Sequence, residues 1–106
     1  MNTFFRKSVL RHLRKERYAV LYEEYLLLFF GDIECLILCS PKHLYLYHTP
    51  DGVPAPPLPK GWGMETNPER SAYALVYQKT FLFPRSPQHL ARSILNALSL
   101  LQGEKQ

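Results

Sequence analysis

Apolar residues near the N-terminus recur at three- and four-residue spacings, the pattern of an amphipathic helix. One apolar stripe consists of Phe5, Val9, Leu10 and Leu13. Thr3 is suited to cap the first turn, and no glycine or proline interrupts the segment up to Arg17. The pattern therefore predicts an N-terminal helix.

The C-terminal segment carries the clearest helix signals in the chain. Ser86 is a natural N-cap, Pro87 suits the first helical position, and Gly103 is placed to end the helix. Between them runs an apolar stripe of Leu90, Ile94, Leu98 and Leu101. We therefore predict a second helix that buries this stripe against the rest of the protein.

Between the helices, several segments have the composition of β-strands, rich in Tyr, Val, Leu, Ile and Phe. They are residues 25–30, 33–39, 44–48 and 71–83. Short turns at 31–32 and 40–43 are suited to join the first three as hairpins. Residues 18–24 leave two alternatives open, a strand or a continued helix, because no breaker separates them from the N-terminal helix.

The predicted order is α-β-β-β-long loop-β-α. Short hairpin loops favour an antiparallel sheet, and two terminal helices most simply pack together on one of its faces. In 71–83 both alternating sets of side chains are mostly apolar, which predicts that both faces of that strand are covered. We predict a single α+β domain over residues 1–106, with a small antiparallel sheet of about four strands between N- and C-terminal helices.

The composition excludes several classes of protein. With 46% hydrophobic and 13% aromatic residues, the chain has the composition of a globular protein and not of a disordered one. No apolar run approaches the ~18 residues that cross a bilayer as a helix, and the N-terminus lacks the pattern of a secretory signal. We expect no transmembrane segment and a cytoplasmic location.

Cys35, Cys39, His43 and His48 are residue types that bind zinc, but their spacing argues against a metal site. Residues four apart in a strand are separated by ~13 Å, whereas both sulfurs of one site must approach zinc to ~2.3 Å. Free cysteine is also among the most frequently buried residue types. We therefore predict core thiols and no bound metal.

The sequence contains no motif for catalysis or for a cofactor. It has no G-x-S-x-G nucleophile elbow and no glycine pattern that binds phosphate. Glu23 and Glu24, the only adjacent carboxylates, would point to opposite faces of a strand. His12 and His89 lie in the predicted helices with no evident acid partner. We predict a non-catalytic protein without a cofactor.

The positive charge of the chain is concentrated at its N-terminus. The basic residues there are Arg6, Lys7, Arg11, Arg14, Lys15 and Arg17, against Glu16 alone, and the rest of the chain is nearly neutral. Three interpretations stay open for this basic patch. It is an ordinary solvated helix face, a contact for nucleic acid or an acidic partner, or an amphipathic helix for an anionic membrane surface or import.

Residues 49–68 form a long proline-rich segment, predicted to be a loop of the kind that is usually functional or disordered. Its candidate binding residues are Pro54, Pro56, Pro57, Leu58, Pro59 and Trp62. The run Pro56-Pro57-Leu58-Pro59 resembles the PPLP core recognised by one class of WW domains, and it also satisfies PxxP. The alternative is that the loop lies along its own domain, with Trp62 as an anchor.

Tyr45 and Tyr47 alternate with leucines in the strand 44–48 and are candidate contacts on a sheet face. Together with the loop they favour a small protein-interaction module, an adaptor or accessory subunit, whose partner is another protein or a second copy of the chain. The alternative function is binding of nucleic acid through the basic N-terminal helix.

Overall fold

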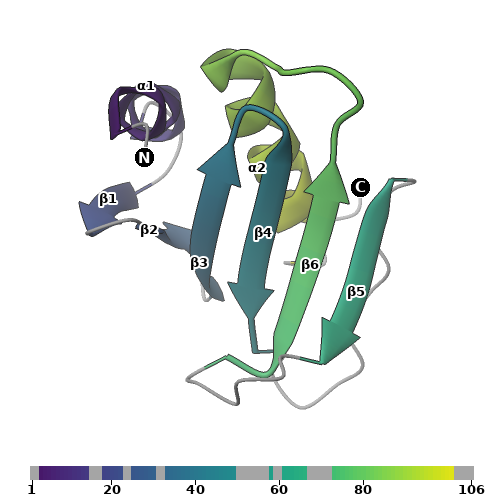
Figure 1. The fold of residues 1–106 in the computed structure, drawn as a ribbon. Helices are drawn as coiled ribbons and strands as arrows, with labels where there is room; N and C mark the ends of the chain where they lie inside the picture. The colour runs from purple at the N-terminus through teal and green to yellow at the C-terminus, as the bar shows by residue number, and fades with distance from the viewer. Residues whose placement is uncertain are drawn as a thin grey trace.

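The computed structural model describes residues 3–14, 18–22, 25–30, 33–49, 58, 61–66 and 73–101. These residues form two helices and one six-stranded antiparallel sheet, with the strand order β1-β2-β3-β4-β6-β5 (Figure 1). The elements are α1 (Thr3–Arg14), β1 (Tyr18–Tyr22), β2 (Tyr25–Phe30), β3 (Ile33–Ser40), β4 (His43–His48), β5 (Trp62–Thr66), β6 (Leu75–Thr80) and α2 (Pro87–Leu101).

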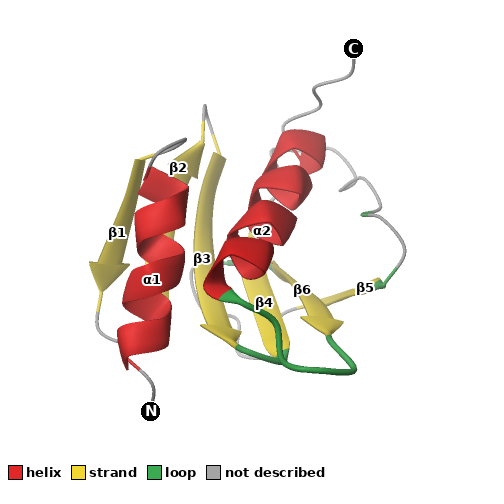
Figure 2. Ribbon diagram, turned by 90° about the horizontal axis from the view of Figure 1, so that it is seen from above, coloured by secondary structure: helices red, strands yellow, loops and turns green. Residues whose placement is uncertain are grey.

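Both helices lie on the same side of the sheet, with α1 beside β1 and β2 and α2 over the centre of the sheet (Figure 2). The two helices also contact each other. Their apolar stripes and the facing side chains of the sheet form one hydrophobic core. The predicted α+β architecture, with terminal helices on one face of an antiparallel sheet, is confirmed.

Helix α2 forms as its sequence signals predict. The backbone N–H of His89 donates to Ser86 Oγ at 3.1 Å, so Ser86 caps the first turn. Leu90, Ile94 and Leu98 are fully buried in the core. The cap satisfies one of the free N–H groups of the first turn, and burial of the stripe supplies the tertiary stabilisation.

The sheet has more strands than the sequence analysis predicted. Residues 18–22, for which strand and helix were both open, form strand β1, which pairs antiparallel with β2 in the register Tyr22↔Tyr25. A single apolar stretch thus supplies two strands. The pair Glu23-Glu24 is the polar interruption between them, a weaker boundary signal than glycine or proline.

The proline-rich segment 49–68 is not a loop throughout, because β5 (Trp62–Thr66) lies within it. This strand pairs with β6 and forms an edge of the sheet. Gly61 precedes it with a φ of 102°, a conformation that residues with a Cβ rarely adopt. Four of the five residues of β5 are exposed, so backbone pairing with β6, together with the packing of Trp62 against the core, holds this edge strand.

The two faces of the sheet differ in what covers them. One face packs on the helices; the other, the open face, is crossed by no described element (Figure 1). On β6, Tyr77 points to the helix face, while Gln78 lies on the open face with Tyr45. Among the described elements, the helices cover only one face of this strand, while Val76 on the open face still has only 6% of its surface exposed. Cross-strand packing explains the apolar character of the second face.

Candidate functional site

The open face carries a band of apolar and aromatic side chains across the central strands. Cross-strand pairing places Leu38 beside Tyr45 and Leu36 beside Tyr47. Tyr47 also pairs with Val76 of β6. The leucines and tyrosines are half-buried, so each still exposes part of its side chain to solvent. The two candidate tyrosines therefore lie together on one surface, as the alternation of β4 predicts.

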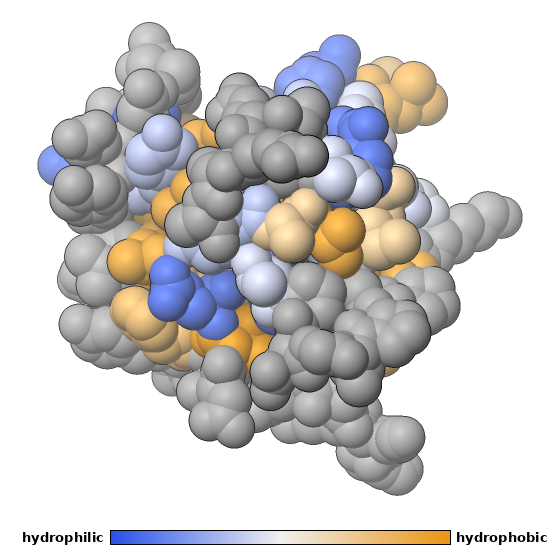
Figure 3. Space-filling model, turned by 90° about the horizontal axis from the view of Figure 1, so that it is seen from below, coloured by the Kyte–Doolittle hydropathy of each residue, from blue (hydrophilic) through white to orange (hydrophobic). Residues whose placement is uncertain are grey.

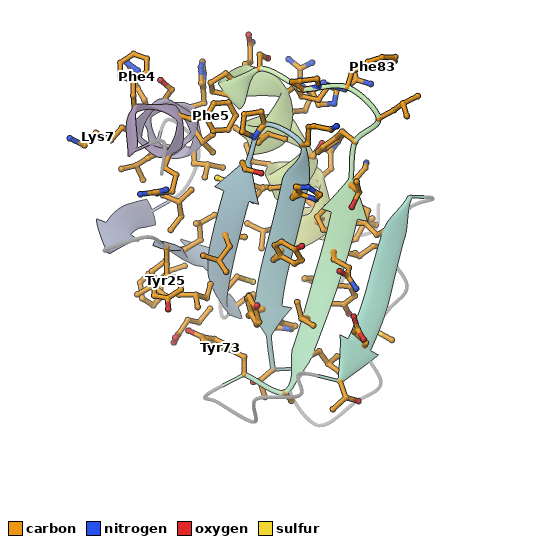
Figure 4. The ribbon with its side chains drawn as sticks, in the orientation of Figure 1. Phe4, Phe5, Lys7, Tyr25, Tyr73 and Phe83 are labelled. Atoms are coloured by element: carbon orange, nitrogen blue, oxygen red, sulfur yellow. The ribbon has the colours of Figure 1, made fainter. Side chains whose placement is uncertain are left out.

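Carboxylates border one end of this band. Glu34 of β3 and Glu65 of β5 are both exposed. Tyr73 donates a hydrogen bond to Glu34 Oε2 at 2.6 Å, and Gln78 donates one to Glu65. Burial, together with the bond to Glu34, raises the pKa of the Tyr73 hydroxyl well above its usual range. Tyr73 lies at the lower end of the molecule (Figure 4).

The opposite end of the open face carries a histidine. The ring of His43 stacks on Tyr45, with 6.3 Å between the ring centroids and 14° between the planes. Thr80 pairs with His43 across strands β4 and β6, and its Oγ1 lies 3.5 Å from His43 Nδ1. Stacking and pairing hold Tyr45 in place on the sheet. At the other end of the molecule, seen from below, hydrophobic and hydrophilic residues lie side by side on the surface (Figure 3).

The proline-rich segment contributes to the other side of the sheet. Leu58 and Trp62 are partly buried and pack against the core that the helices cover. Trp62 pairs with Lys79, whose Nζ lies 5.7 Å from the centroid of the indole ring. The structure thus places Trp62 as an anchor, on the face opposite Tyr45 and Tyr47. The remaining candidates of this segment, Pro54, Pro56, Pro57 and Pro59, lie outside the described residues.

The basic patch of the N-terminal helix is divided in the structure. Lys7 and Arg11 are exposed, whereas Arg6 is buried, with 6% of its surface exposed, and does not belong to the exposed patch. Its helical position borders the apolar stripe, so the side chain turns inward. Arg14 is described only as part of the helix, and the last two members of the patch, Lys15 and Arg17, lie outside the described residues.

Both cysteines are free and buried on the helix face of β3. Burial raises the pKa of the Cys35 thiol to about 12 and that of the Cys39 thiol to about 11. The charge of Arg6 acts in the opposite direction on Cys39, but more weakly than burial. Both groups are therefore neutral thiols near neutral pH, and neutral thiols are poor nucleophiles and poor metal ligands.

We expect the thiols to react slowly in the native protein and at once after unfolding. At about pH 8 a free thiol with its ordinary pKa is partly ionised, whereas these two are protonated. Because folding raises both pKa values, the stability that the thiols contribute is complete below pH ~9 and is lost as the pH rises toward 11–12. The rate of labelling with a maleimide, with and without denaturant, measures the difference in reactivity between folded and unfolded protein. Labelling of both thiols at the same rate in the two conditions would contradict their assignment to the core.

His48 is also buried on the helix face, with 8% of its surface exposed. Burial lowers the pKa of its imidazole, which favours the neutral ring. Among the residues that the structure describes, no three His, Cys, Asp or Glu side chains lie where they could share a metal ion. His43, the remaining member of the candidate zinc set, lies exposed beside Tyr45.

The sequence analysis missed one exposed apolar feature. It assigned residues 71–83 to a strand, but β6 ends at Thr80. Leu82 and Phe83 follow it in the β6–α2 connection and are 79% and 64% exposed. Pro84 directly follows them, and it is the sequence signal that could have indicated an earlier end of the strand.

Neither described helix has the length and hydropathy that a membrane-spanning helix requires. Compared with family models, curated proteins and solved structures, the chain matches none of them.

Proposed function

We propose that the protein is a small non-catalytic interaction module, an adaptor or accessory subunit, that binds another protein through the open face. The observation that supports this proposal is the half-exposed band around Leu36, Leu38, Tyr45 and Tyr47, on a sheet face that no described element crosses. An apolar band with a polar border is characteristic of interaction sites.

The two tyrosines supply the contact chemistry. A tyrosine ring offers a large apolar surface and a hydroxyl at its tip, and it loses little conformational entropy on binding. Tyr45 and Tyr47 are already oriented by their cross-strand neighbours and, for Tyr45, by the stacked ring of His43. Pre-orientation lowers the ordering cost that association otherwise carries. These two residues are therefore the proposed centre of the interface.

The charges around the band define the chemistry of the partner. Two of the described side chains on this face, Glu34 and Glu65, are carboxylates at the same end. Complementary potentials steer association and suppress wrong partners. We therefore propose a partner that presents an apolar segment flanked on one side by Lys or Arg.

The proline-rich segment would contribute a separate contact. Because Leu58 and Trp62 pack toward the helix side, a partner that binds these two residues would not share a surface with Tyr45. Nucleic-acid binding through α1 stays the alternative function, with Lys7 and Arg11 as its exposed cations. For location we propose the cytoplasm, since two free thiols suit a reducing compartment.

The experiment that tests the proposal is affinity purification from nuclease-treated native lysate, followed by binding measurements with the identified partner as a purified protein. We expect Tyr45→Ala/Tyr47→Ala to weaken binding by about 2 kcal/mol or more, which corresponds to roughly 30-fold in Kd. Leu82→Ser/Phe83→Ser, which removes exposed apolar surface elsewhere, serves as the matched control and should bind as wild type.

Two results would contradict the proposal. The first is a purified partner whose affinity is unchanged by the tyrosine substitutions. The second is a concentration-dependent dimer, seen by light scattering, that the same substitutions abolish, because it would assign the open face to a second copy of the chain. Recovery of nucleic acid from untreated lysate, with salt-dependent binding lost in Lys7→Glu/Arg11→Glu, would favour the alternative function.

A further inference from the structure

The connection between β6 and α2 presents the two most exposed neighbouring apolar side chains among the described residues. Leu82 is 79% exposed and Phe83 is 64% exposed. We call these two residues the apolar tip. Large apolar side chains that stand next to each other in water are unfavourable unless another surface covers them.

The apolar tip is held in place by its flanks. The N–H of Phe81 donates to the carbonyl of Lys42 and the N–H of Arg85 donates to the carbonyl of Pro41, both at 2.8 Å. The Phe81 ring is buried and meets His89 edge-on, with 5.6 Å between centroids. Two backbone hydrogen bonds and one buried ring thus fix the base of the connection. The exposure of its tip is therefore a property of the folded state and not of a frayed end.

Basic groups surround the apolar tip. Lys42 and Arg85 are both exposed, and the guanidinium of Arg85 lies 5.9 Å from the centroid of the Phe81 ring. The chain contains no acidic residue between Glu34 and Asp51 or between Glu69 and Glu104, so the turn and the connection that form this end carry none. The first turn of α2, which starts beside the tip, also contains no acidic residue.

The described carboxylates lie at the other end of the sheet. Glu34 is near the start of β3 and Lys42 lies in the turn after its last residue, Ser40; Glu34 and Ser40 are about 20 Å apart along an extended strand. Glu65 pairs with Val76, whereas the β6 residue next to the tip, Thr80, pairs with His43. Among the described residues, the end that carries the apolar tip is therefore basic and the opposite end of the sheet carries the carboxylates.

Helix α1 adds a second contact at the same end. Phe4 is 77% exposed, and Lys7, one turn further along the helix, is also exposed. Phe4 and Phe83 both project from the upper end of the molecule, from two different elements (Figure 4). Apolar side chains accompanied by cations thus occur at two separate points of one end.

We propose that this end docks on the surface of an anionic lipid bilayer. Leu82 and Phe83 enter the boundary between headgroups and acyl chains, Phe4 makes a second shallow insertion, and Lys42 and Arg85 bind lipid phosphates. Two contributions hold peripheral proteins on membranes: buried apolar area and attraction to anionic headgroups. The exposed apolar residues supply the first, and the neighbouring Lys42 and Arg85 supply the second. A protein partner would require complementary concave pockets, whereas a bilayer accepts a convex tip.

This inference goes beyond the interaction module proposed above and uses different residues. The open face lies on the front of the sheet, and the apolar tip projects from the upper end (Figures 1 and 4). A protein docked through the tip would keep Tyr45 and Tyr47 available to a partner. The two proposals can therefore fail independently.

The test is co-sedimentation of the full chain with vesicles of phosphatidylcholine alone or with about 30% phosphatidylserine, since the attraction depends on anionic lipid. We expect binding only to the anionic vesicles and a partition coefficient at least about tenfold lower for Leu82→Ser/Phe83→Ser. Arg85→Glu and Lys42→Glu should also lower the partition coefficient, and vesicle binding by these variants should depend less on salt than binding by the wild type. Met64→Ser removes a side chain that is 51% exposed outside the tip and should bind as wild type.

A fluorescence experiment measures insertion itself. Phe83→Trp is placed in a Trp62→Phe background, since Trp62 is the only tryptophan. Its emission should shift to the blue with anionic vesicles and be quenched by brominated acyl chains, whereas a tryptophan introduced at Met64 should not respond. Circular dichroism and thermal unfolding verify that each variant is folded, which we expect because every substituted tip residue is exposed.

Several outcomes would overturn the proposal. One is wild-type protein that binds anionic vesicles no better than neutral ones, and another is full binding by the folded tip variant. If the protein binds no vesicles but binds DNA or RNA, and Arg85→Glu weakens that binding, the basic residues beside the tip would be assigned to nucleic acid. A dimer that the tip variant abolishes, again without vesicle binding, would assign the tip to a second copy.

Discussion

Replacing Ile94 or Leu98 with alanine is expected to destabilise the protein by about 2–5 kcal/mol, the cost typical of a large-to-small substitution in a packed core. Both side chains have 0% of their surface exposed and lie in the stripe that joins α2 to the sheet. Each substitution removes buried apolar contacts and leaves a cavity that the surrounding side chains fill only in part. Such a loss is a large share of the stability of a domain of this size.

Urea denaturation measures this effect as a lower midpoint with an unchanged slope. Leu100→Ala is the matched control, because Leu100 lies on the same helix and is 39% exposed. It removes the same atoms as Leu98→Ala from a site that is not packed, so the midpoint should move little. Equal effects of the two leucine substitutions would show that the stripe does not face the core.

Tyr77→Ala is expected to cost about 3–5 kcal/mol, as for other large aromatic side chains in cores. Tyr77 is 1% exposed and lies on the helix face of β6, where it pairs with Leu46 of β4. Its ring thus fills space between the two central strands and the helix layer. Burial also raises the pKa of its hydroxyl, which keeps the group neutral in the folded protein.

Tyr45→Ala is the control for this prediction, since it removes the same side chain from the adjacent strand on the open face. Tyr45 is half-buried, and its substitution should cost about 0.2–1 kcal/mol for each of its two cross-strand pairs, with Leu38 and Gln78. Chemical denaturation of the two variants side by side tests which face of the sheet is the core. A larger cost for Tyr45→Ala would reverse the assignment of the faces and remove the basis of the proposed interface.

The helices were predictable because their signals are local. The 3.6-residue period of α2 and its Ser86 cap are written within one short segment, and the structure has both. The strands β3 and β4 were also predictable, since their apolar runs are separated by a turn that contains Pro41. In each case the residues that specify the element are neighbours in the chain.

The sequence analysis failed where pairing partners are distant in the chain. Strand β5 has four exposed residues out of five and is held largely by its pairing with β6, so its sequence lacks the apolar run that marks a buried strand. Its first residue, Trp62, was assigned to a loop, although its role as an anchor was considered and agrees with the packing in the structure. Composition could not reveal that this segment returns to the sheet edge.

The candidate binding residues likewise divide into those placed by local sequence pattern and those placed by contacts between distant segments. Tyr45 and Tyr47 were placed on one face by the two-residue period of a strand, which is a local property. That Trp62 lies on the opposite face follows from the register of β5 on β6, which involves residues far apart in the chain. The inward turn of Arg6 likewise depends on what α1 packs against.

The sequence by itself determined the class of the fold, the two helices, the central hairpin and the burial of the thiols, because periodicity, capping and composition act over a few residues. Only the tertiary structure decided that the face with Tyr45 stays open, that β5 completes an edge, and that Leu82 and Phe83 project beside Lys42 and Arg85. These features arise from strand order and from contacts between remote segments. Local propensities do not encode which of the two sheet faces the helices cover.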